Sequence, residues 1–356
     1  MRNLAMQLRS DWSGYLLRAP KLLCFVCMTA LHSFPTNAQQ SAEEFFRGKT
    51  VTVVIPTTPG GDRGGNATVL LSHISRHIPG NPRVIPNFMP GAGGLVAMNY
   101  LNNVAPRDGT FIASPLTTFI VAQVTGEQAV RYDVSKMNWI GRTTESTQVL
   151  YVWHTVHVHG VDDAKKRVVT VGSSGVNSPS TIIPQIMNNV FGTQFRVIQG
   201  YKGSTTFNLA TSRGETDASL TTWGNLRNNH SDWVREKKAR VLFQVLLTRH
   251  PELQDVPTAH ELAKTDEDKS LIDLMTSSAE LGQAFIAPPD VPSHIVDALR
   301  RAFDATMTDP EYIAISKKMG NELNPMTGAE LAALAARTLA TPKTVVERYH
   351  KATSVR

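Results

Sequence analysis

Short apolar runs alternate with longer amphipathic segments along most of the chain. Residues 51–55 form an apolar run rich in β-branched side chains, and residues 67–78 then repeat apolar side chains at a helical spacing. The same order returns later as a predicted strand at 167–171, a helix at 179–191 and a strand at 195–198. This alternation predicts an α/β protein in which helices cover parallel sheets.

Further predicted elements complete the pattern. Additional strands are expected at 84–87, 110–113 and 241–246, and additional helices at 95–102, 205–213, 292–307, 310–319 and 327–339. Thr327 and Glu330 have the spacing of a capping box at the start of the last of these helices. Two connections, around 143–150 and 249–268, are the expected crossings between two lobes.

The N-terminus has the pattern of a secretory signal. Residues 1–21 carry four cations and one acid, residues 22–31 are an apolar run, and small residues lead to Ala38. The apolar run is about half as long as a membrane-spanning helix. We expect cleavage after Ala38, export by the general secretory route and a periplasmic location.

The net charge and the cysteine content of the mature chain differ from those of the full chain, because the predicted signal peptide would be removed. The full chain has a formal charge of +6, and half of it lies in residues 1–38, as do both cysteines. A remaining charge of +3 and the lack of a basic, aromatic-rich run argue against nucleic-acid binding. A mature chain without thiols has no disulfide and no thiolate metal site.

Two loops are the best candidates for chemistry. Residues 57–66 and 172–178 are rich in Gly, Ser, Thr and Asn, and each lies between a predicted strand and a predicted helix. Backbone N–H groups and a helix N-terminus make such a loop an anion site that needs no lysine. The alternative is that both loops are tight turns that require glycine. The first loop lacks the Lys-Ser/Thr of a phosphate-binding loop and the glycine spacing of a dinucleotide fingerprint.

Other motifs are weaker. Three histidines and two aspartates within 154–163 could bind a metal, but a solvated strand edge is the preferred interpretation. The Gly-Ser-Ser-Gly sequence at 172–175 differs from a nucleophile elbow, and no paired base accompanies it. We therefore predict no catalytic residue, no metal and no cofactor.

Eight short stretches occur in a characteristic order over nearly the whole mature chain. They are Phe-Arg-Gly-Lys-Thr-Val at 46–51, Pro-Gly-Gly at 59–61, Asn-Phe-Met-Pro-Gly-Ala-Gly-Gly at 87–94, Ala-Pro-Arg-Asp-Gly-Thr at 105–110, Gly-Tyr-Lys-Gly at 200–203, Arg-Gly-Glu-Thr-Asp at 213–217, Asp-Val-Pro-Thr at 255–258 and Phe-Ile-Ala-Pro-Pro at 285–289. In this order the chain resembles the extracytoplasmic solute-binding receptors of the tripartite tricarboxylate transporters.

The resemblance implies a fold and a function. The fold is α/β, a two-lobed periplasmic binding protein of type II (Venus flytrap) with two crossing hinge segments. The expected division is a signal peptide at 1–38, a first lobe at 39–145, a second lobe at 146–250, and a return to the first lobe with the C-terminal helices at 251–356. The implied function is capture of a small organic carboxylate for a membrane permease, by a monomer without enzymatic activity. A ligand-presenting partner of a membrane kinase and an exported α/β enzyme are the alternatives.

The resemblance also assigns ligand contacts position by position. In the first lobe they are Thr57, Thr58, Pro59, Gly60, Gly61 and Asp62, with Ser114 and Thr117 from the turn after a later strand. In the second lobe they are Ser174, Gly175, Asn177, Ser178, Tyr201, Asp217 and Trp223. The family loop usually carries an Asp at the helix start, and one common spacing places it at Gly64. The acid in this loop is Asp62, so the usual role of that carboxylate is lost or moved.

Overall fold

The computed structural model describes residues 40–59 and 62–354, except for the side chain of Asp62. The predicted signal peptide therefore lies outside the described residues, as do Gly60 and Gly61. None of the helices in the described part is long and apolar enough to cross a lipid bilayer.

Six strands form the first sheet, in the order β11-β4-β10-β3-β1-β2. The strands are β1 (Thr50–Ile55), β2 (Arg83–Phe88), β3 (Phe111–Ala113), β4 (Asn138–Arg142), β10 (Ala284–Ala287) and β11 (Met326–Thr327). The sheet is parallel from β3 through β1 to β2, whereas β10 runs antiparallel to both β3 and β4. The first lobe is this sheet with the helices that cover it.

Five strands form the second sheet, in the order β7-β6-β8-β5-β9. They are β5 (Gln148–Trp153), β6 (Val169–Gly172), β7 (Phe195–Ile198), β8 (Ala218–Thr222) and β9 (Ala239–Val245). Strand β6 is parallel to β7 and β8, but β5 is antiparallel to β8 and β9. The prediction of parallel sheets is therefore only partly right. The strands that enter each sheet from the other lobe, β10 and β5, run antiparallel to their neighbours. The second lobe is this sheet with its helices.

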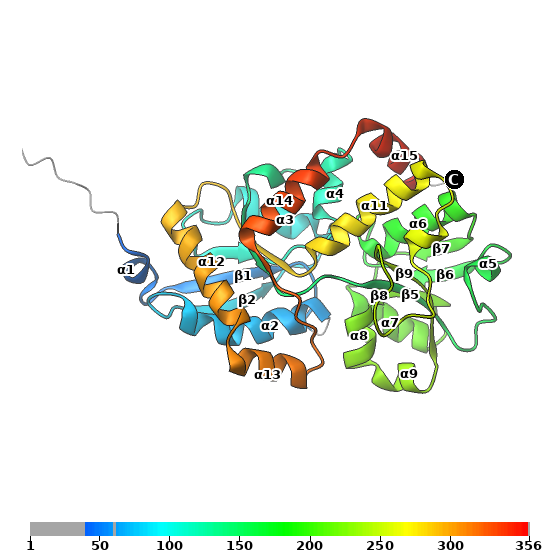
Figure 1. The fold of residues 1–356 in the computed structure, drawn as a ribbon, viewed down its shortest axis with the longest axis horizontal. Coiled ribbons are helices and arrows are strands. Elements are labelled where there is room, and N and C mark those ends of the chain that lie inside the picture. Colours follow the sequence, from blue (N-terminus) through cyan, green and yellow to red (C-terminus); the bar gives the residue numbers. More distant parts are fainter. Residues whose placement is uncertain (1–39, 60–61, 355–356) are drawn as a thin grey trace, which may run out of the picture. The chain divides into compact units, whose positions relative to one another are not determined.

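Amphipathic helices cover both sheets (Figure 1). The first lobe contains α1 (Ala42–Phe46), α2 (Asp62–Ile74), η1 (Ser75–His77), η2 (Ala92–Gly94), α3 (Leu95–Asn103), α4 (Phe119–Val124), η3 (Val134–Lys136), α12 (Ser293–Met307), α13 (Pro310–Lys318) and α14 (Gly328–Leu339). The second lobe contains α5 (Val161–Ala164), α6 (Pro179–Phe191), α7 (Ser204–Ser212), α8 (Trp223–Asn229) and α9 (Ser231–Arg235). Between β9 and β10 the chain forms α10 (Ala259–Leu262) and α11 (Asp266–Leu281). The last helix, α15 (Lys343–Thr353), packs against α6 and α11.

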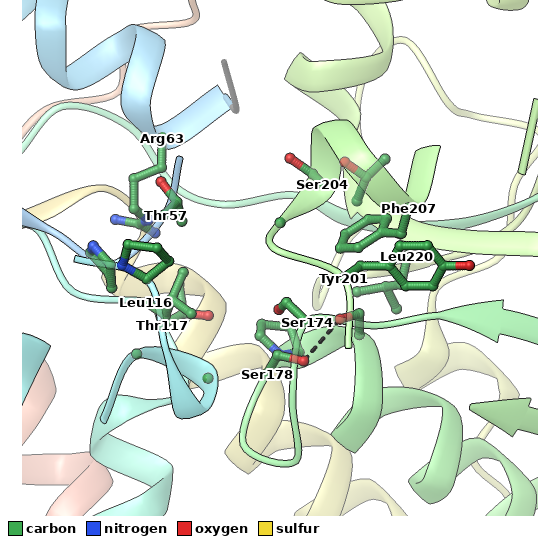
Figure 2. A pocket seen from close by; sticks show the side chains of 18 of the residues that line it. Thr57, Arg63, Leu116, Thr117, Ser174, Ser178, Tyr201, Ser204, Phe207 and Leu220 are labelled. Atoms are coloured by element: carbon green, nitrogen blue, oxygen red, sulfur yellow. Dashed lines mark hydrogen bonds between the residues drawn. The ribbon is translucent and has the colours of Figure 1, made fainter. Parts of the chain in front are cut away.

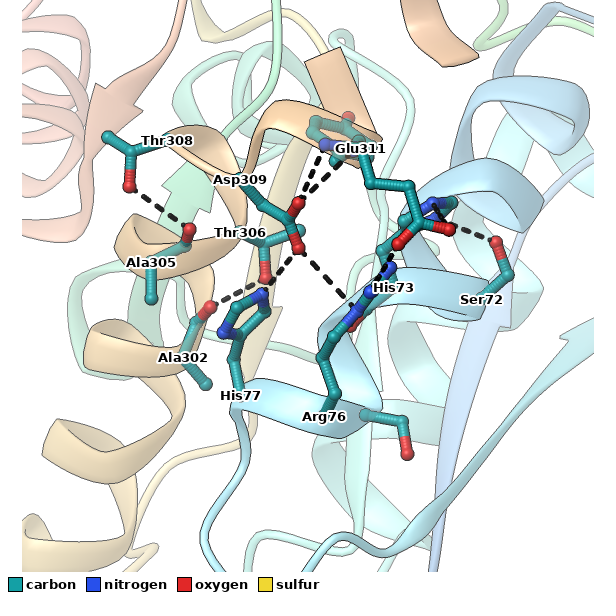
Figure 3. A network of polar contacts seen from close by, with 12 residues as sticks. Ser72, His73, Arg76, His77, Ala302, Ala305, Thr306, Thr308, Asp309 and Glu311 are labelled. Atoms are coloured by element: carbon teal, nitrogen blue, oxygen red, sulfur yellow. Dashed lines mark hydrogen bonds and ion pairs between the residues drawn. The ribbon is translucent and has the colours of Figure 1, made fainter. Parts of the chain in front are cut away.

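A polar network fixes α13 to the end of α2 and η1 (Figure 3). Asp309 caps α13 by accepting hydrogen bonds from the backbone N–H groups of Glu311 and Tyr312. The same carboxylate lies 2.9 Å from His77 Nε2 and 3.5 Å from Arg76 Nε. The His77 hydrogen bond, the backbone N–H groups and the Arg76 charge lower the pKa of Asp309 to about 2.

The two connections between the lobes are hydrogen-bonded to each other. The first is residues 143–147, between β4 and β5, and the second reaches β10 through α11 and residues 282–283. Gln283 N donates to Thr144 O over 2.9 Å, and Ser146 N donates to Ala279 O over 3.0 Å. Gly282 is pressed against this pair, since a Cβ there would lie 2.0 Å from Thr144 O.

Candidate ligand-binding site

A cavity of about 400 Å³ lies between the two lobes and is lined by both. Its walls come from strand ends and helix starts that are far apart in the sequence (Figure 2). The first lobe contributes Thr57, Arg63, Leu116 and Thr117, together with the loop at 90–94. This volume is within the range of small-molecule sites in proteins.

Three helices of nine or more residues begin at the cavity. Arg63 lies in the first turn of α2, Pro179 and Ser180 in the first turn of α6, and Ser204 is the first residue of α7. The first backbone N–H groups of a helix lack intrahelical partners, and the helix dipole adds partial positive charge there. The cavity is therefore an environment that favours an anion.

Arg63 adds a buried cation to this environment. Its side chain is only 8% exposed, and it donates to Ser114 Oγ and to the carbonyl oxygen of Gly282, each over 3.1 Å. The exposed Lys202 lies at the other side of the cavity. The glycine and hydroxyl loops are therefore accompanied by a cation that sequence reasoning does not single out, because the side chain of Arg63 turns inward from α2.

Among the residues that the structure describes, two buried hydroxyls in the cavity lining have no hydrogen-bond partner. They are Thr57 Oγ1, just after β1, and Thr221 Oγ1, near the end of β8. Thr221 is 4% exposed. Leaving a buried hydroxyl unsatisfied costs about 1–3 kcal/mol, so a bound ligand that meets these groups would recover that free energy.

Hydroxyls of the second predicted loop and of the first turn of α6 are bonded to one another. Ser173 Oγ lies 2.9 Å from both Ser178 Oγ and Ser180 Oγ, and 2.6 Å from Thr181 Oγ1. Ser178 Oγ also donates to the carbonyl oxygen of Gly175 over 2.8 Å. This cluster fixes the loop shape in front of α6, so the hydroxyls of Ser173 and Ser178 are committed within the protein.

The predicted contact residues divide into three groups. Those that line the cavity are Thr57, Thr117, Ser174, Ser178 and Tyr201. Those that lie outside the lining are Thr58, Pro59, Ser114, Gly175, Asn177, Asp217 and Trp223. Gly60, Gly61 and the side chain of Asp62 are not among the described parts of the chain.

Several residues outside the lining support the site. The Asp217 carboxylate accepts hydrogen bonds from Thr170 N and Oγ1, both over 2.8 Å, and so joins the start of β8 to β6. Trp223 Nε1 donates to Glu252 over 2.6 Å. Ser114 is fully buried and holds the Arg63 guanidinium. These side chains do not line the cavity, but their hydrogen bonds stabilise the strands, helices and side chains that do.

The two lobes touch on both sides of the cavity. On one side Thr118 Oγ1 donates to the carbonyl oxygen of Asn177 over 2.8 Å, next to Gly93. On the other side Arg227 Nη1 lies 2.6 Å from Glu322 Oε1. A hydrogen bond with His250 and the Arg227 charge lower the pKa of Glu322. Both contacts therefore join the lobes directly beside the cavity.

Sequence reasoning misses part of the lining. It does not single out Phe207 or Leu220 as contacts. The Pro-Gly-Ala-Gly-Gly run at 90–94 predicts a helix start but not a wall of the site.

Within the part of the chain that the structure describes, no three His, Cys, Asp or Glu side chains cluster to hold a metal.

Comparisons with known proteins agree with this architecture. The family model described as "Tripartite tricarboxylate transporter family receptor" matches residues 70–350. The periplasmic binding protein BugD superposes with a TM-score of 0.67 at 19% identity, over 85% of this chain and 97% of BugD. MatC of Rhodopseudomonas palustris with bound malate gives 0.67 at 19% identity, over 86% and 99% of the two chains. A second R. palustris protein, with adipate, gives 0.65 at 17% identity, over 86% and 97%. No curated protein matches the sequence. The predicted two-lobed fold of a periplasmic binding protein is confirmed.

Proposed function

Because the chain belongs to the tripartite tricarboxylate transporter receptor family, we propose that it captures a small organic carboxylate between its lobes and delivers it to a membrane permease. Malate and adipate, bound to two proteins of the same fold, are both small carboxylates. A periplasmic location, a monomeric state and release of the ligand unchanged are parts of the same proposal. The predicted signal sequence supports the location.

The observation that carries the proposal is the cation inside the cavity. Arg63 and Lys202 are the charged side chains among the described lining residues, and three helix N-termini add to their positive potential. The planar guanidinium can donate two parallel hydrogen bonds to a carboxylate. Thr57 Oγ1 offers a further donor nearby (Figure 2).

One position at which the family loop usually carries its acid has no room for a side chain in this protein. Gly64 stands at one of the expected positions, and a Cβ there would lie 2.7 Å from Thr58 O and 2.8 Å from Pro59 O. The first turn of α2 instead presents Arg63 to the cavity. This exchange favours an anionic ligand over one that presents an amine.

Calorimetric titration of the exported, mature protein with mono-, di- and tricarboxylates tests the proposal. Binding of a carboxylate should weaken at least about 30-fold in Arg63→Gln, because removing one partner of a buried charge pair costs about 2 kcal/mol or more. Arg83→Gln, at an exposed position at the start of β2, is the matched control and should bind as the wild type does. If Arg63→Gln folds poorly, Arg63→Lys is the substitute test. It retains the charge but loses the planar guanidinium, and its affinity should lie between those of the wild type and an uncharged variant.

Two outcomes would refute the proposal: failure of every carboxylate to bind, or wild-type affinity in a folded Arg63→Gln variant. Chromatography of the ligand after incubation tests whether it is released unchanged. Co-purification with permease subunits from membranes tests delivery, whereas capture of a kinase instead would favour the sensor alternative.

A further inference from the structure

The wall of the cavity opposite Arg63 is apolar and partly aromatic. Figure 2 shows Phe207, Tyr201 and Leu220 on the side away from Arg63 and Thr57. Phe207 and Leu220 are 4% and 2% exposed. A Cβ on Gly172 would lie 2.7 Å from Phe207 Cβ and 3.4 Å from a ring carbon of Tyr201, so both residues cover the end of β6.

Apolar side chains extend this wall around the cavity. Leu116 approaches from the first lobe, and three prolines complete the apolar surface: Pro56, Pro90 and Pro179. A ligand that is polar along its whole length would lose hydration against these groups without recovering hydrogen bonds. An apolar ligand body would instead gain by burial.

Part of the polar lining of the cavity is already hydrogen-bonded within the protein. The hydroxyls of Ser178 and Ser180 already bond to Ser173. The buried hydroxyls of the lining that lack a partner, among the described residues, are those of Thr57 and Thr221. A di- or tricarboxylate carries two or three anionic groups, whereas the described lining offers one buried cation, Arg63, and its other cation, Lys202, is exposed.

We propose that the ligand is an aromatic monocarboxylate. Its carboxylate pairs with Arg63 and Thr57, and its ring lies against Tyr201, Phe207 and Leu220. Thr221 is left for one neutral polar substituent on the ring. The inference rests on the proposed function, since it specifies which carboxylate the same cavity selects.

Competition among defined probes tests this specificity. Benzoate and 3-phenylpropanoate should bind at least about tenfold more tightly than malate and adipate, because only the aromatic acids bury a ring against the apolar wall. Benzamide, which lacks the charge, should bind at least about tenfold more weakly than benzoate. The measured quantity is the ratio of dissociation constants, from calorimetry on the mature protein.

Substitution of Tyr201 separates the wall from the anion site. Tyr201→Ala should reduce the preference for benzoate over malate at least about fivefold, while Tyr201→Leu retains part of it. Tyr100→Ala is the matched control, because Tyr100 is half-buried in α3 and lies outside the lining. Circular dichroism on each variant verifies that it is folded.

The outcomes distinguish the two proposals. Tighter binding of malate or adipate than of either aromatic acid would overturn the aromatic assignment and leave the carboxylate receptor intact. An unchanged preference in both folded Tyr201 variants would also overturn it. Failure of all four acids and of the wider carboxylate panel would overturn the receptor function itself.

Discussion

Replacing Gly93 by Ala tests whether contact between the lobes controls ligand affinity. Gly93 has φ +64°, and a Cβ at this position would lie 2.6 Å from the carbonyl carbon of Asn177 and 2.7 Å from Ser178 N. These are backbone atoms of the other lobe, so they cannot rotate away as a flexible side chain would. The added methyl group acts only when the lobes are closed.

The expected loss follows from these distances. Carbon atoms pack at about 3.5–4.0 Å, so the lobes would separate by roughly 1 Å at Gly93. The hydrogen bond from Thr118 Oγ1 to Asn177 O, now 2.8 Å, would then be too long to persist. Losing this bond and the adjoining contacts should cost at least about 1.4 kcal/mol, a tenfold rise in the dissociation constant.

Gly126→Ala is the control for backbone strain. Gly126 has a similar φ, +69°, but nothing lies within 4 Å of the position that a Cβ would take there. Both variants should lose about 1–2 kcal/mol of folding stability from the left-handed backbone, measured by urea denaturation. Only Gly93→Ala should bind the carboxylate more weakly by calorimetry. Wild-type affinity in Gly93→Ala, or an equal loss in both variants, would refute the reasoning.

Four further substitutions probe other parts of the structure. Thr221→Val should weaken binding of a ring-hydroxylated benzoate about tenfold and leave the affinity for benzoate itself unchanged, while folding stability stays equal or rises by about 1 kcal/mol because an unpaired buried hydroxyl is removed. Unchanged affinity for the hydroxylated acid by calorimetry would contradict this. Asp217→Asn should reduce stability to urea by about 1 kcal/mol and leave the dissociation constant within about threefold; a larger change in affinity would place Asp217 in the site. Arg227→Gln should raise the dissociation constant a few-fold at low salt, and the difference should vanish at about 1 M NaCl because the pair with Glu322 is partly exposed; a salt-independent difference would argue against an electrostatic contact. The pKa of Asp309 is lowered from 3.8 to about 2, so the stability that the Asp309 carboxylate contributes is present above pH 4 and is lost as the pH falls toward 2. Asp309→Asn should therefore flatten the pH dependence of stability to urea over that range. An unchanged profile would count against the capping network.

The first lobe shows how far sequence reasoning reaches. The β-branched run at 51–55 and the helical spacing after it predict β1 and α2, since local periodicity determines both. The inward direction of Arg63 cannot be predicted in the same way. Its orientation depends on Ser114 and Gly282, which are 51 and 219 residues away in the sequence.

The second lobe shows a different limit. The Gly and Ser content of the loop before α6 predicts a binding loop, and the loop does border the cavity. Its composition cannot reveal that the hydroxyls bond to one another, because that depends on the loop's conformation. The resemblance predicts Asp217 and Trp223 as ligand contacts, and in the structure their side chains bond to Thr170 and Glu252.

The carbonyl of Gly282 gives the crossing segments a direct link to the cavity. One guanidinium nitrogen of Arg63 bonds to this carbonyl, and the other bonds to Ser114. Gly282 is in turn wedged against Thr144 of the other crossing segment. In the proposed receptor, the guanidinium that binds the ligand therefore also contacts the hinge. We therefore expect a carboxylate that binds this guanidinium to compete with the Gly282 carbonyl for its hydrogen bonds, which would couple ligand release to the opening of the lobes.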